Sequence, residues 1–96
     1  MNARDTEADL LSRCVRISRG EVESLDDERV ANVVRVAAIL ARPRNPAAAD
    51  RLREAADAYF ARNPDSRRSA DELIRLEWLI SFPRFREQLD ARLGSA

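Results

Sequence analysis

The spacing of apolar residues predicts a chain built from helices. The first apolar series recurs at one, four and seven positions after its first member, which is one face of a helix: Leu10, Leu11, Cys14, Ile17. The expected helix covers residues 6–19, because Gly20 offers a C-terminal stop. Arginines at 13, 16 and 19 lie away from the apolar face.

A second helix is predicted over residues 25–42, with an unusually wide apolar surface. At 100° per residue its apolar side chains spread over about 220° of the circumference: Val30, Val33, Val34, Val36, Ala37, Ala38, Leu40, Ala41. Only Glu28, Asn32 and Arg35 form a polar stripe, which Ile39 interrupts. The valines raise a strand alternative, but polar residues do not alternate along the segment. We therefore expect the central helix of a bundle.

An acidic segment precedes this helix. Residues 21–28 hold five carboxylates and no basic residue. The simplest interpretation is a loop followed by the electronegative first turn of the helix, with Ser24 as the N-cap.

Prolines and capping residues divide the rest of the chain. Asn45 is a good N-cap and Pro46 suits a first helical position, so a helix is predicted over 46–62. Its expected core residues are Leu52, Ala55, Ala56 and Tyr59. A capping box over residues 69–72 begins a helix predicted over 70–82, and Pro83 and Gly94 bound a last helix over 83–93. The fold class is all-α, a compact four- to five-helix bundle forming one domain over residues 1–96.

The segment 70–82 carries two apolar stripes on opposite sides of the expected helix. One holds Leu73, Leu76, Leu79 and Ile80; the other holds Ile74, Trp78 and Phe82. A helix with two apolar faces is typical of one sandwiched between layers.

Two hypotheses compete for the stripe around Trp78. In the first, the last helix folds back and places Phe85 and Leu89 against Trp78 and Ile74. In the second, the stripe and nearby arginines bind a protein, because Trp and Arg are enriched among the residues that dominate interfaces. The residues of that predicted protein interface are Ile74, Trp78, Phe82, Phe85, Arg75, Arg84 and Arg86. A homodimer is the expected state, since small helical domains often complete a core by association.

The composition argues against an enzyme. Net charge is zero, histidine is absent, and all seventeen basic residues are arginine. The usual acid–base group near neutral pH is therefore missing, as are Schiff-base chemistry and the lysine of phosphate loops. Cys14, on an apolar face and without an activating histidine, is expected to be a buried thiol. The carboxylates of Asp50, Glu54 and Asp57, near Arg51 and Arg53, are expected to form a solvated salt-bridge face. We expect no catalytic residue, cofactor, metal or small-molecule substrate.

Nucleic-acid binding is the alternative function. It would use the arginine clusters Arg13, Arg16, Arg19, Arg67 and Arg68. Zero net charge and a pI of about 6.3 argue against it, because such domains usually carry a basic excess.

The sequence favours a non-enzymatic interaction, regulatory or adaptor module, self-associating or a subunit of a bacterial assembly. The arginine-only basic content and many alanines suggest GC-rich bacterial coding. The longest apolar run has six residues, Val36–Ala41, where about 20 are needed to cross a membrane. The polar N-terminus lacks the apolar stretch of a signal peptide, so a cytoplasmic location is expected.

Overall fold

The computed structural model describes residues 7–21, 24–68 and 84–94. They form four helices and no strand: α1 (Glu7–Ser18), α2 (Glu28–Ala41), α3 (Pro46–Arg62) and α5 (Phe85–Leu93). The helix expected over 70–82, with its capping box and two apolar stripes, lies outside the described residues. The mostly helical, compact fold predicted from the sequence is confirmed, and the strand alternative for residues 25–42 is wrong.

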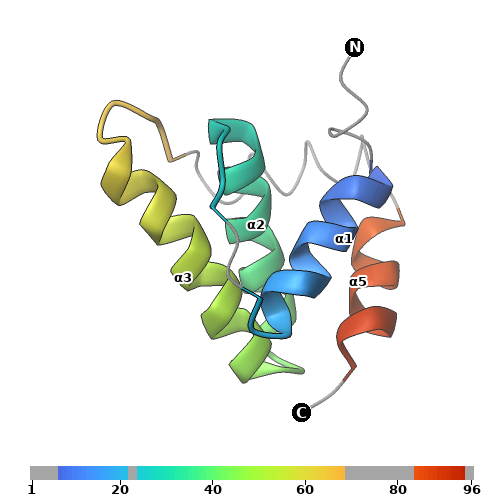
Figure 1. Ribbon diagram of the computed structural model, residues 1–96. Coiled ribbons are helices and arrows are strands. Elements are labelled where there is room, and N and C mark those ends of the chain that lie inside the picture. Colours follow the sequence, from blue (N-terminus) through green and yellow to red (C-terminus); the bar gives the residue numbers. More distant parts are fainter. Residues whose placement is uncertain (1–6, 22–23, 69–83, 95–96) are drawn as a thin grey trace.

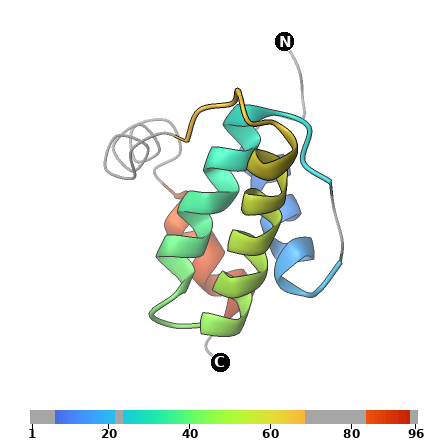
Figure 2. The same cartoon turned by 90° about the vertical axis from the view of Figure 1, so that its left-hand side faces the viewer.

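The central helix of the fold is α2. It runs antiparallel to α3, and α1 and α5 lie behind this pair, with α1 packed against α3 and α2, and α5 packed against α2 (Figures 1 and 2). Its wide apolar surface explains this position, because both sides of the helix are covered by neighbours. Nine of its residues are buried: Val30, Ala31, Asn32, Val33, Val34, Val36, Ala37, Ala38 and Ala41. The sequence prediction of a central helix is confirmed.

Three helix ends follow the residues that the sequence offered. After α1, the Glu21 N–H donates to the Arg16 carbonyl (3.1 Å) and the Gly20 N–H to the Ile17 carbonyl (3.0 Å). These two bonds make a Schellman cap, which needs the left-handed φ of +93° that Gly20 adopts. The Asn45 side chain caps α3 by accepting from the Ala48 N–H at 3.1 Å, with Pro46 in the first turn. Gly94, with φ of +69°, ends α5.

The start of α2 corrects the sequence prediction. The helix begins at Glu28 rather than at residue 25, and its N-cap is Asp27 instead of Ser24. The Asp27 carboxylate accepts from the Arg29 N–H at 2.7 Å and the Val30 N–H at 3.4 Å. Leu25 is buried in the preceding loop, and its carbonyl accepts a hydrogen bond from Arg62 of α3 at 3.2 Å. These contacts hold Leu25 in the loop. The helix therefore takes its N-cap from Asp27, three residues after Ser24.

The polar stripe expected on α2 is also partly covered. Asn32 is only 6% exposed, and its amide donates to the carbonyls of Glu28 and Arg67, each at 3.1 Å. The loop after α3 therefore crosses the start of α2. The Arg67 N–H donates to the Glu28 carboxylate at 2.6 Å and fixes the same crossing.

The fold has a radius of gyration of 12.2 Å, close to the value of about 12.5 Å typical of a compact domain of this length. None of the helices in the described ranges has the length and apolar character needed to span a membrane.

Candidate functional site

The predicted protein interface falls only partly within the described residues. Ile74, Arg75, Trp78 and Phe82 lie outside them. Arg84 and Arg86, at the start of α5, are exposed.

Phe85, between these two arginines, is 1% exposed and belongs to the core. Its prediction as a contact residue is wrong, because α5 turns this side toward α1 and α2. Leu89, on the same side of α5, is fully buried. Phe85 and Leu89 are thus core residues, whereas their predicted contact with Trp78 and Ile74 involves residues outside the described ranges.

The arginines proposed for nucleic acid do not form one surface. The Arg13 side chain is 14% exposed and lies 3.8 Å from the Asp26 carboxylate. Arg16 donates to the Ser12 hydroxyl at 2.9 Å. Arg16 and Arg19 end α1 beside the first half of α3, whereas Arg67 and Arg68 follow the other end of α3 (Figure 1).

Arg68 is engaged within the fold as well. Its guanidinium lies 5.0 Å from the centre of the Phe60 ring and 3.6 Å from the Asp57 carboxylate. Phe60 in turn packs edge-to-face on Tyr59, with 5.3 Å between ring centres. The cluster holds the loop after α3 in place, so Arg68 has a structural role.

The chemistry-bearing side chains in the described ranges form no reactive cluster. Cys14 is fully buried, which confirms its predicted burial. Asp50 pairs with Arg42 at 3.0 Å and Asp57 with Arg68, both on the surface, so two of the three carboxylates form surface salt bridges, with partners other than Arg51 and Arg53. The described residues contain no group of three or more histidine, cysteine, aspartate or glutamate side chains that could hold a metal ion.

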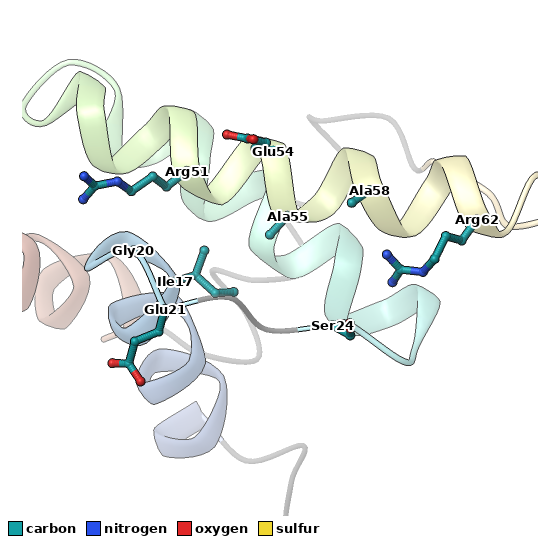
Figure 3. Close-up of a pocket in the computed structure, with 9 residues that line it drawn as sticks. All are labelled: Ile17, Gly20, Glu21, Ser24, Arg51, Glu54, Ala55, Ala58 and Arg62. Carbon is teal, nitrogen blue, oxygen red and sulfur yellow. The ribbon is translucent and has the colours of Figure 1, made fainter.

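A groove between α3 and the end of α1 is the candidate site (Figure 3). It encloses about 380 Å³. Ile17 of α1 and Ala55 of α3 face each other across it, and Ala58 lies one turn further along α3 (Figure 3). Arg51, Glu54 and Arg62 of α3 line the groove together with Gly20, Glu21 and Ser24 of the opposite loop.

Two arginines of this groove are held by backbone carbonyls. Arg51 donates to the Ser18 carbonyl at 2.7 Å, and Arg62 donates to the Leu25 carbonyl at 3.2 Å. Each bond uses one terminal nitrogen of a guanidinium that has five N–H donors in all. Both arginines therefore tie α3 to the opposite wall of the groove and keep further donors for a ligand.

The groove exists because α3 places alanines where its neighbours are not in close contact. Ala55 is half-buried and Ala58 is exposed, although Ala55 was expected to be a core residue. The position of the groove was not predicted from the sequence. The alanines of α3 mark where a groove can form, but the opposite wall is positioned by tertiary contacts, among them the bonds of Arg51 to the Ser18 carbonyl and of Arg62 to the Leu25 carbonyl.

A comparison of the chain with protein-family models, curated proteins and solved structures finds no match.

Proposed function

We propose that the chain is a non-enzymatic protein–protein interaction module of a regulatory or adaptor kind, which associates with itself or with subunits of a larger bacterial assembly. The observation that carries this proposal is the groove between α1 and α3, with its apolar floor and charged rim. An apolar centre surrounded by polar groups is the usual anatomy of a protein interface.

The rim arginines support the same function. Arginine is enriched at interfaces, where its fork of donors binds carboxylates and carbonyls. Arg51 and Arg62 are already oriented by the Ser18 and Leu25 carbonyls, so less side-chain freedom is lost when a partner binds. The start of the opposite wall is held in a similar way, since the Schellman cap after α1 fixes Gly20 and Glu21.

Two further predictions from the sequence belong to this proposal. The bundle has a fifth helix over residues 70–82, and Ile74, Arg75, Trp78 and Phe82 form a second contact surface with Arg84 and Arg86. A cytoplasmic location also stays part of the proposal. No observation on the described residues favours the nucleic-acid alternative. Arg16 and Arg19 lie beside the first half of α3, whereas Arg67 and Arg68 follow its other end.

The test is a bulky, charged side chain in the groove. Ala58→Arg replaces an exposed residue of the groove, so the fold is retained and binding is blocked. Ala47→Arg is the matched control, because Ala47 is exposed on the same helix but does not line the groove. Self-association is measured by analytical ultracentrifugation, and hetero-association by retention of host proteins on the immobilised full chain.

The proposal predicts an association that Ala58→Arg weakens and Ala47→Arg leaves intact, with circular dichroism unchanged in both. Association that both variants retain equally contradicts a role for the groove. A parent chain that neither self-associates nor retains any protein sensitive to Ala58→Arg contradicts the proposed function.

A further inference from the structure

We propose that the occupant of the groove is a second copy of this chain, with its α3 antiparallel to the first across a two-fold axis at Ala58. This inference rests on the proposed function and identifies the partner. In a two-fold dimer the same surface meets itself, so the surface must be complementary to its own reversed copy.

The order of side chains along α3 has that property about Ala58. Glu54 precedes Ala58 by four residues and Arg62 follows it by four, and both line the groove. In an antiparallel pair centred on Ala58, Glu54 of each copy faces Arg62 of the other. Two opposite-charge pairs result from one symmetry operation.

The side chains between the two charged pairs are small. Ala58 lies at the centre of the proposed contact and is exposed. Ala55 and Ala61 occupy the positions three residues before and after. Between the charged pairs the contact is therefore made of alanines, which allow helix axes to approach to about 8 Å.

The side chains of Glu54 and Arg62 keep hydrogen-bonding groups for the proposed ion pairs. Among the described residues, no ion pair engages the Glu54 carboxylate, which is exposed. Arg62 uses one nitrogen on the Leu25 carbonyl and Arg51 one on the Ser18 carbonyl. Each guanidinium keeps further N–H donors that can bind a carboxylate.

Other orientations and occupants fit the charges less well. A parallel pair in register would place Glu54 against Glu54 and Arg62 against Arg62. A strongly acidic or strongly basic segment of another protein would meet a like charge on the rim, since Glu21 and Glu54 alternate with Arg51 and Arg62. A reversed copy of α3 meets the opposite charge at both Glu54 and Arg62.

The experiment is a charge exchange on the full chain, with dimerisation measured by sedimentation equilibrium at low salt. Glu54→Arg places arginine against Arg62, and Arg62→Glu places glutamate against Glu54. Each single variant is expected to raise the dimer Kd at least about tenfold, because two pairs per dimer change from attraction to repulsion. The double variant Glu54→Arg/Arg62→Glu restores opposite charges and is expected to recover the dimer.

Controls separate pairing from net charge and from folding. Arg53→Glu changes charge as Arg62→Glu does, on the same helix but outside the groove, and Glu87→Arg matches Glu54→Arg on α5. Both are expected to leave the dimer Kd unchanged. Circular dichroism identifies a variant that fails to fold, and Glu54→Arg alone then decides, since Glu54 has no bond within the described fold to lose.

The outcomes distinguish this inference from the proposed function. Recovery in the double variant supports a second copy on the groove. A monomeric parent, or a dimer that Glu54→Arg leaves unchanged, overturns it. In that case a foreign protein whose retention depends on Ala58 would still support the interaction module.

Discussion

At the scale of single residues, burial of a polar side chain is what the sequence pattern predicts least well. Asn32 lies on the polar stripe of α2 and was expected to face solvent with Glu28 and Arg35. It is buried because a loop 35 residues further along the chain supplies the Arg67 carbonyl that its amide binds. Helical periodicity describes one helix at a time and contains no information on a distant loop. The prediction of Phe85 as an interface residue was wrong for the same reason, since only the packing of α5 decides which neighbours cover this side chain.

The amide of Asn32 is expected to contribute to stability through its two carbonyl acceptors. Asn32→Ala removes both hydrogen bonds of a buried amide, including the bond that holds the loop after α3 to α2, so the free energy of unfolding should fall by about 1–3 kcal/mol. Urea denaturation followed by circular dichroism measures it. Arg53→Ala, an exposed change, should stay within about 0.5 kcal/mol. An Asn32→Ala variant as stable as this control would contradict the role given to the loop crossing.

At the scale of helices, local chemistry determined most of the boundaries. The caps at Gly20, Asn45 and Gly94 were correctly predicted because each depends on residues within one turn. The start of α2 was wrong, since Ser24 and Asp27 are both acceptable caps and the sequence alone does not rank them. A tertiary contact ranks them: Leu25 is buried and its carbonyl is bound by Arg62.

The assignment of the α2 cap gives a direct comparison between two side chains. Asp27→Ala removes the acceptor for the Arg29 and Val30 N–H groups, and it should lower the free energy of unfolding by about 1 kcal/mol. Ser24→Ala is the control, because Ser24 is exposed and lies outside the cap. Thermal or urea unfolding of both variants tests the assignment. A larger loss for Ser24→Ala than for Asp27→Ala would show that the helix starts earlier.

At the scale of the whole molecule, the sequence predicted the helical class and the central position of α2, but not the surface that matters here. The groove depends on the distance between α1 and α3. The hydrogen bonds of Arg51 and Arg62 to the opposite wall set that distance. The charge order about Ala58 was present in the sequence. It became informative only when the structure showed Glu54, Ala58 and Arg62 lining one exposed groove.

The most direct measurement of the account is a cross-link at the proposed two-fold axis. Ala58→Cys places two thiols opposite each other on the axis, and a disulfide can join them when their Cα atoms lie about 4.4–6.8 Å apart. Ala47→Cys is the control, since its two copies would lie about 33 Å apart along the paired helices. Cys14 is fully buried in both variants. Under mild oxidation, non-reducing electrophoresis should show a covalent dimer for Ala58→Cys and a monomer for Ala47→Cys. A monomer for both, or equal cross-linking in both, would contradict the α3–α3 interface.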